Sequence, residues 1–479
     1  MSKKNQAVNG FLWNGIDAFA KYGLSFIISV VLARILSPGD YGLVGLTLIF
    51  IEVSQTFIDG GFSQSLLRKK DCTQEDYSTV FYFNLVLGIT LYSVLFFSSG
   101  FIADLFGREE IKSMIKLQGI AIIISSLTLI QQVTLQRRMN FKTLTIISMV
   151  STLIGGGVGI YFALNNFGAL SIVYMTLSSQ ALASILYWTN NKWMPSGFYK
   201  ESFKSLFKFG NKMLISRLIN VIFENFTGVI ITKFHSFSDF GLYTRADSLR
   251  KMPSRMLAGI VQTVSLPLLA SLQDEPERLK DAYRRLIKTS MFVNLIVIFG
   301  LMVTAKSFIL ILLGEKWESV VLYLQLLCIP TLIFPMQSLN LNIISVKGRS
   351  DLHLKLELIK KISLLPIFAI GIYYGIIPMI WGLIINAAFS FYLNSYYSGN
   401  LISYPISEQI KDILPSVSLI AISSLAGYVI VFLNLNKFIE FFTQIGLVLG
   451  LVILISEKNK LPEYLEVKKI VLSKINRAA

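Results

Sequence analysis

The chain has 479 residues, of which 53% are hydrophobic and only 15% carry a charge, and its formal net charge is +16. Soluble globular proteins carry about 25% charged residues, so this composition excludes an ordinary soluble protein and indicates that lipid surrounds most of the chain. The apolar runs are too long for the strands of a membrane barrel, and an open sheet edge cannot lie in hydrocarbon. We therefore predict an all-α membrane protein.

About fourteen apolar runs are long enough to cross a bilayer as helices. In chain order they cover residues 11–33, 42–66, 80–100, 114–135, 143–163, 168–189, 211–232, 242–270, 287–305, 319–345, 356–375, 376–397, 413–433 and 437–456. The first run follows the basic stretch MSKKNQAVNG, which is typical of a retained cytoplasmic end and not of a cleaved signal peptide. The two cysteines and two histidines are too dispersed to predict a disulfide framework or a metal site, and we expect no cofactor.

The positive charges indicate how these spans are oriented. If the N-terminus is cytoplasmic and the spans alternate, most of the 44 lysines and arginines fall on cytoplasmic segments, and only Lys21 and Arg217 lie inside spans. Both termini are then cytoplasmic. We therefore expect the positive charges to set the orientation of the spans and to contact anionic lipids. No stretch of the sequence interleaves aromatic and basic residues as a nucleic-acid-binding module does. The predicted outside loops are short and leave no room for an extracytoplasmic active site, so we do not expect an enzyme.

A short motif occurs once in each half of the chain, as SPGDYGL at 37–43 and as SFSDFGL at 236–242. In each copy an aspartate, Asp40 or Asp239, is suited to cap the following helix. A glycine, Gly42 or Gly241, allows two backbones to approach closely. An even number of spans separates the copies, which predicts a parallel repeat of two six-helix lobes, an architecture of secondary transporters. The alternative is chance, because any outside hairpin favours such residues.

The repeat predicts the domain organisation. It consists of an N-terminal lobe at 1–190, a cytoplasmic linker at 191–210, a C-terminal lobe at 211–398, two further helices within 399–456 and a basic cytoplasmic tail at 457–479.

Several longer sequence segments occur in this order along the chain: LARILSPGDYGLVGL, FIDGGFSQSLLRK, LFKFG, DFGLYTRADSL, SLPLLASLQD and LLGEKWESVVLYLQLL. In order and spacing the chain resembles the polysaccharide-transporter (Wzx-type flippase) branch of the multidrug/oligosaccharidyl-lipid/polysaccharide exporter superfamily. The resemblance implies a flippase that moves an undecaprenyl-diphosphate-linked oligosaccharide across the bacterial inner membrane, for lipopolysaccharide O-antigen, capsule or exopolysaccharide. Its partners would be this lipid-linked oligosaccharide, membrane lipids, a polysaccharide polymerase and a chain-length regulator.

Charged residues inside spans are costly and are therefore candidates for function. Asp17 and Lys21 are four residues apart on the first span, so they share one helix face. They could line a cavity between the lobes. The alternative is that they neutralise each other near the inner end of the helix, with the Lys21 ammonium reaching the interface.

Arg217 and Glu224 are seven residues apart on the span at 211–232 and also share a face. An arginine in a central cavity suits a diphosphate, because its guanidinium offers two parallel donors, and the resemblance implies a cationic cavity. The alternative is an arginine near the cytoplasmic interface that only sets topology. We predict Arg217, Lys21, Asp17 and Glu224 as substrate-binding residues.

Glu52 and Asp59 are seven residues apart on the span at 42–66. Two carboxylates on one face could exchange protons and so couple transport to an ion gradient. They could also face a polar groove without such a role, or Asp59 could cap the inner end of its helix, which is the interpretation we prefer for Asp59.

Two other functions remain open from the sequence. A multidrug or metabolite exporter of the same superfamily would need an acidic cavity for organic cations. A membrane polysaccharide polymerase or ligase would need an outside catalytic loop, and the predicted loops are short. The chain has no glycine-rich phosphate loop of the P-loop type, so we expect an ion or substrate gradient to drive transport.

Overall fold

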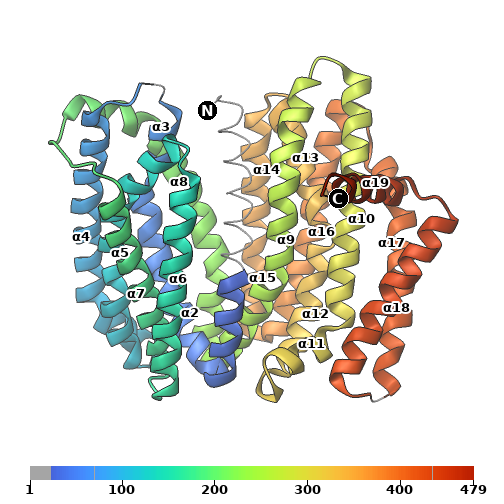
Figure 1. Cartoon of the computed structure of the whole chain (residues 1–479), viewed down its shortest axis with the longest axis horizontal. Helices are drawn as coiled ribbons and strands as arrows, with labels where there is room; N and C mark the ends of the chain where they lie inside the picture. The colour runs from blue at the N-terminus through green and yellow to red at the C-terminus, as the bar shows by residue number, and fades with distance from the viewer. Residues whose placement is uncertain (1–22, 70, 434, 479) are drawn as a thin grey trace. The chain divides into compact units, whose positions relative to one another are not determined.

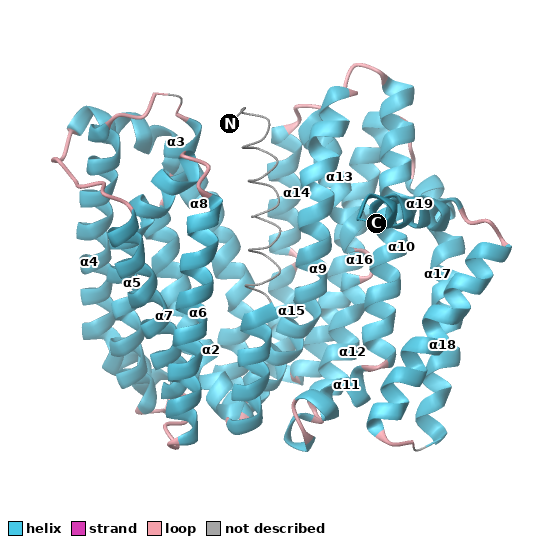
Figure 2. Cartoon of the chain, in the orientation of Figure 1, coloured by secondary structure: helices cyan, strands magenta, loops and turns pink. Residues whose placement is uncertain are grey.

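The structure is a computed structural model that describes residues 23–69, 71–433 and 435–478. These residues form helices joined by short loops, and no strand occurs among them (Figure 1, Figure 2). The all-α prediction is thereby confirmed. The internal contacts divide the chain into two compact units, Met1–Gly241 and Leu242–Ala479.

The first unit contains a short apolar helix, Gly23–Ile35. It continues with α2 (Pro38–Asp59), α3 (Phe62–Arg68), α4 (Gln74–Phe106), α5 (Glu110–Arg137), α6 (Phe141–Leu164), α7 (Leu170–Asn190) and α8 (Lys200–Phe234). The next helix, α9 (Phe237–Ser271), begins in this unit and continues into the second.

The second unit contains the remaining helices. They are α10 (Pro276–Val303), α11 (Ala305–Leu312), η1 (Glu315–Trp317), α12 (Val320–Thr331), α13 (Phe334–Val346), α14 (Ser350–Ile362), α15 (Leu364–Tyr374), α16 (Ile376–Ile402), α17 (Ile406–Val429), η2 (Ile430–Leu433), α18 (Lys437–Lys458) and α19 (Pro462–Ala478). Helix α8 groups with the first unit by its contacts. The predicted division into two lobes and a linker stays a prediction.

Eleven segments in the described part of the chain are long and apolar enough to cross a membrane, and each matches one predicted run. The predicted total of fourteen is not confirmed. The run at 11–33 lies largely outside the described residues. The run at 242–270 is covered by α9, which carries charged residues at 245, 247, 250 and 251 and is not among the eleven. The run at 356–375 is divided at Ser363 between α14 and α15.

The repeated motif builds the same local structure twice. Ser37 is the N-cap of α2: its Oγ accepts from the backbone N–H of Asp40 (3.2 Å), and the Asp40 carboxylate accepts from the N–H of Ser37 (2.9 Å). In the second copy the N–H of Asp239 donates to Ser236 Oγ (3.0 Å), and this hydroxyl donates to the Asp239 carboxylate (2.6 Å). The serine is thus the capping residue and the aspartate fixes it, which satisfies N–H groups that a helix start leaves unpaired.

The two copies also contact each other through their glycines. A Cβ on Gly42 would lie 1.8 Å from the backbone oxygen of Phe237, and a Cβ on Gly241 would lie 1.8 Å from the backbone oxygen of Pro38. Pro38 and Phe237 hold the same position in the two copies, so the contact is reciprocal. Only glycine permits this approach, because the opposing atoms are backbone and cannot rotate away.

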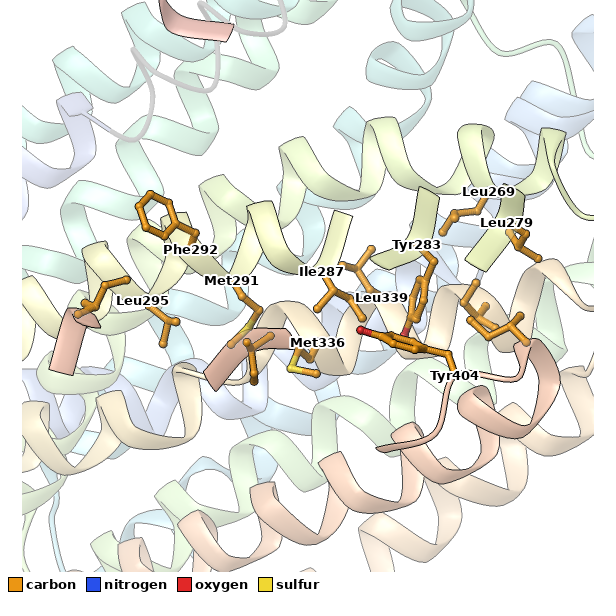
Figure 3. Close-up of a cluster of buried hydrophobic side chains, with 14 of the residues drawn as sticks. Leu269, Leu279, Tyr283, Ile287, Met291, Phe292, Leu295, Met336, Leu339 and Tyr404 are labelled. Atoms are coloured by element: carbon orange, nitrogen blue, oxygen red, sulfur yellow. The ribbon is translucent and has the colours of Figure 1, made fainter. Parts of the chain in front are cut away.

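A hydrophobic core of the second unit contains two buried tyrosines, Tyr283 of α10 and Tyr404 after α16 (Figure 3). The Tyr283 hydroxyl donates to the side-chain oxygen of Asn340 on α13, and the Asn340 amide donates to Ser395 Oγ on α16 (2.8 Å). The Tyr404 hydroxyl donates to the Asp412 carboxylate of α17 (2.6 Å). A shared set of buried polar groups therefore joins α10, α13, α16 and α17.

The span at 320–346 is broken between α12 and α13. Pro330 and Pro335 flank the break, and a proline removes one backbone donor and crowds the preceding turn. The side-chain amide of Asn294, which is fully buried on α10, donates to the backbone oxygens of Thr331 (3.0 Å) and Leu332 (3.0 Å). Asn294 thus satisfies carbonyl groups that the broken helix exposes within the core.

We expect Asn294→Leu to lower the free energy of unfolding by about 2 kcal/mol, because the buried carbonyl groups lose their donor while the replacement has similar volume. Unfolding of the purified protein in detergent micelles measures the change. Asn165→Leu, at the exposed end of α6, is the matched control and should leave stability nearly unchanged. Equal stability of Asn294→Leu and the parent would contradict this role.

Candidate functional site

Helices α2 and α8 present charged and polar side chains to each other within the first unit. The guanidinium of Arg217 on α8 pairs with the carboxylate of Asp59 at the end of α2. Two turns earlier on α2, the carboxylate of Glu52 accepts a hydrogen bond from the amide of Asn225 on α8 (2.9 Å). The seven-residue spacing therefore places Glu52 and Asp59 on the same face, toward α8.

In the ion pair between Arg217 and Asp59, the arginine side chain is the more exposed partner. The Arg217 side chain is 58% exposed, whereas that of Asp59 is 20% exposed. The hydrogen bond to Asp59 uses one guanidinium nitrogen, Nη1, and the other nitrogens of Arg217 have no hydrogen-bond partner among the described residues. A guanidinium has five N–H donors, so Arg217 keeps donors for an anionic ligand while Asp59 holds its orientation.

This pair lies at a cavity of about 250 Å³ within the first unit. Three glutamines, Gln55, Gln132 and Gln180, line the cavity together with Asp59 and Arg217. Amide side chains offer both donors and acceptors, which suits the hydroxyl groups of a sugar. The cavity thus combines one accessible cation with neutral groups that can form hydrogen bonds.

The other predicted site residues are placed differently. Glu224 is exposed on α8, and no ion pair joins it to another residue in the described ranges. Glu52 is also exposed. Asp17 and Lys21 lie outside the described residues. Of the six predicted residues, the structure brings Arg217 and Asp59 into direct contact, with Glu52 on the same face of α2.

A second charged group, in the second unit, was missed by the sequence analysis. On α9 the Asp247 carboxylate pairs with both the Arg250 guanidinium (2.5 Å) and the Lys251 ammonium (2.6 Å). Arg250 also donates to the hydroxyl of Thr331 at the end of α12 (3.0 Å), next to the break in that span. Two cations share one carboxylate here, so the group keeps a net positive charge.

The orientation argument counted only Lys21 and Arg217 inside spans and assigned the other cations to cytoplasmic segments, outside segments or helix starts. Helix α9, which covers the run at 242–270, is not among the eleven candidate spans. The helix begins at Phe237, so Arg250 and Lys251 lie well inside it and not at its start. The segment TRADSLRK could have predicted this charged group. It places Asp247 three and four residues before the two cations, which is the spacing of pairs on one helix face.

The sequence matches a known family over much of its length. Residues 31–322 match the polysaccharide biosynthesis protein family. The lipopolysaccharide biosynthesis protein WzxC of Escherichia coli (strain K12) is 24% identical over 374 residues, which covers 78% of this chain and 76% of that protein. The succinoglycan biosynthesis transport protein ExoT of Rhizobium meliloti (strain 1021) is 25% identical over 378 residues, which covers 78% of this chain and 76% of that protein.

The fold is similar to that of the lipid II flippase MurJ in its inward closed conformation. The TM-score is 0.70 at 17% sequence identity, and the match covers 93% of this chain and 98% of MurJ. At this identity the similarity concerns the fold. The match over residues 31–322, together with the helical membrane fold, establishes that this chain belongs to the polysaccharide biosynthesis protein family.

Proposed function

We propose that this protein is a flippase that moves an undecaprenyl-diphosphate-linked oligosaccharide across the bacterial inner membrane. The names of WzxC and ExoT, which refer to polysaccharide biosynthesis and transport, and the MurJ-like fold support this proposal. The observation that carries it is the exposed guanidinium of Arg217 beside three glutamines in one cavity. A diphosphate joined to sugars needs this combination of one cation and several neutral hydrogen-bonding groups.

The substrate contact follows from the chemistry of the pair. Asp59 holds the guanidinium of Arg217, and phosphate oxygens would bind the remaining donors of this guanidinium. The charged group of α9, with Arg250 and Lys251, offers the second unit a cation of the same kind. Lys21, Asp17 and Glu224 remain proposed cavity residues of the first and seventh spans.

Transport would proceed by alternating access between the two predicted lobes, 1–190 and 211–398. The sugar-diphosphate head crosses through the polar cavity while the lipid tail stays in the bilayer. A charged headgroup is unfavourable in hydrocarbon, so hydrogen-bond donors of the protein replace the water around the headgroup while it crosses the membrane. Both termini would be cytoplasmic, and a polysaccharide polymerase and a chain-length regulator would act on the product at the outer face.

We propose Glu52 and Asp59 as the residues that couple transport to an ion gradient, with Glu52 the stronger candidate because Asp59 is engaged by Arg217. We expect Glu52→Gln to keep the hydrogen bond to Asn225 but to flatten the pH dependence of transport, because an amide cannot exchange a proton. Transport rates in vesicles at several pH values measure this. Glu75→Gln, at the exposed start of α4, is the control. An unchanged pH profile would remove Glu52 from the mechanism.

The function is tested by extracting undecaprenyl-linked lipids from the native host after deletion of this gene, followed by mass spectrometry. Accumulation of one oligosaccharide-diphosphate lipid, reversed when the gene is restored, is the expected result and identifies the substrate. Intact surface polysaccharide without accumulation would overturn the flippase assignment and favour an exporter of other compounds.

A further inference from the structure

A polar cavity of about 440 Å³ lies within the second unit, between α10 and α19. It is separate from the cavity at Arg217, which belongs to the first unit. Six charged residues line it: Asp281, Arg284, Arg285 and Lys288 of α10, and Glu463 and Glu466 of α19.

The three cations of this cavity all belong to α10. They lie opposite two acids of α19, Glu463 and Glu466, while a third acid, Asp281, belongs to α10 itself. The two walls do not close on each other as tight ion pairs: Lys288 Nζ lies 3.6 Å from Glu463 Oε2, and no other ion pair in the described ranges joins α10 to α19. Arg284 is engaged elsewhere, by the Asp412 carboxylate of α17.

Neutral groups and packing hold α19 in place instead. Ser416 Oγ donates to Glu463 Oε1 (2.6 Å), and Thr289 Oγ1 donates to Glu466 Oε2 (2.6 Å). The ring of Tyr464 packs edge-on against Phe292, with the ring centres 6.4 Å apart. Hydrogen bonds from neutral hydroxyl groups to the two carboxylates, together with this ring contact, therefore hold α19 in place.

Glu463 carries the strongest indication of a ligand. Its side chain is only 2% exposed, and its second oxygen, Oε2, accepts no hydrogen bond from any described residue. Buried carboxylate oxygens ordinarily have hydrogen-bond donors, because removing a charge from water without them is unfavourable. Glu463 lines the cavity opposite the cations of α10, and Lys288 Nζ lies 3.6 Å from this oxygen, beyond hydrogen-bond distance. A ligand in the cavity can therefore supply the hydrogen-bond donor that Oε2 lacks.

The position of the cavity indicates where the donor comes from. Helix α10 passes here from the charged stretch PERLKDAYRRLIK into the apolar stretch SMFVNLIVIFGLMV, as a helix does on entering a bilayer. Helix α19 runs across α10 in the view of Figure 1. Its residues Leu465 and Leu472 share one face and are 41% and 48% exposed, which is typical of a helix in the headgroup layer.

We propose that this cavity binds the headgroup of an aminophospholipid, with the phosphate on Arg285 and Lys288 and the primary ammonium donating to Glu463 Oε2. Cations on α10 opposite the two acids of α19 match a zwitterion with a phosphate and an ammonium at its two ends. A choline headgroup has no N–H to donate, and an anionic glycerol headgroup carries no ammonium that could donate to Glu463 Oε2. The inference is independent of the flippase proposal.

The test is lipid retention by the full-length protein, purified in detergent and titrated with dioleoyl phosphatidylethanolamine, phosphatidylcholine or phosphatidylglycerol before native mass spectrometry. We expect phosphatidylethanolamine to bind about tenfold more tightly than phosphatidylcholine, the discrimination expected of one charge-assisted hydrogen bond. Equal retention of the three lipids would overturn the proposal. Free phosphoethanolamine could also displace the bound phosphatidylethanolamine at a concentration equal to that at which the lipid itself binds. That result would contradict a lipid as the ligand and indicate a soluble zwitterion.

Variants separate the two ends of the headgroup. Glu463→Gln, which can still accept from Ser416, should abolish the preference for ethanolamine over choline, and Arg285→Gln should weaken binding of all three lipids. Arg278→Gln, 73% exposed on α10 outside the cavity, is the matched control and should bind like the parent. If Glu463→Gln fails to fold, Glu466→Gln should reduce the same preference. An unchanged preference in folded variants, or equal loss in Arg278→Gln, would contradict the assignment.

Discussion

Arg217→Ala is expected to reduce translocation of the lipid-linked oligosaccharide about 100-fold, since the proposed substrate contact would lose at least two charge-assisted hydrogen bonds to the diphosphate. The protein should still insert and fold, because the Arg217 side chain is 58% exposed and an exposed ion pair contributes at most about 1 kcal/mol to stability. Complementation of surface polysaccharide in the deletion host measures the effect, with protein level determined in parallel.

Matched variants distinguish a diphosphate contact from a general need for charge. Arg217→Lys keeps the charge but loses the parallel donors, so it should be intermediate. Lys208→Ala, which removes an exposed cation from the same helix, should transport like the parent. Transport by Arg217→Ala at the parental rate would show that the guanidinium does not hold the substrate.

Gly42→Ala and Gly241→Ala are each expected to lower the free energy of unfolding by about 2–3 kcal/mol, the range for overpacking a site that cannot relax. Each new Cβ would lie 1.8 Å from a backbone oxygen of the other motif copy, so the two copies must separate. Because either substitution forces the same separation, the double variant should lose clearly less than the sum of the two losses. Unfolding of the purified variants in detergent measures all three values.

The control for this prediction lies in the first motif itself. A Cβ on Gly39 would meet only Ser37 Oγ at 3.7 Å, an ordinary contact, so Gly39→Ala should be as stable as the parent. Strictly additive losses in the Gly42 and Gly241 variants, or no loss in either, would show that the reciprocal contact does not stabilise the fold.

The helical membrane fold could be predicted because hydropathy and length are local properties. The same holds for the capped motif copies, whose serine and aspartate satisfy helix N–H groups within three residues in both places. The count of spans was less secure, because α9 carries charges that mutual pairing makes tolerable within a helix. Composition alone does not reveal that Asp247 neutralises part of this charge.

The site could be predicted only in part. The spacing of Glu52 and Asp59 predicts a shared face, but the partner of Asp59, Arg217, is distant in sequence and belongs to another helix. The preferred interpretation of Asp59 as a helix-end cap rested on local sequence, whereas the turn after α2 is closed by Gly60 in the left-handed conformation. The role of Asn294 is likewise invisible in the sequence, since the carbonyl groups it satisfies arise from a break in a different span.

The most direct test of the proposed flippase uses the purified protein in liposomes that contain a labelled undecaprenyl-diphosphate oligosaccharide. An enzyme that cannot cross the membrane then releases the sugar from the outer leaflet. We predict that liposomes with the parent protein release the label from both leaflets, whereas protein-free liposomes and those with Arg217→Ala release only the label that began outside. If the parent protein leaves the inner-leaflet label protected under every imposed ion gradient, this chain does not translocate the lipid-linked oligosaccharide, and the central claim is wrong.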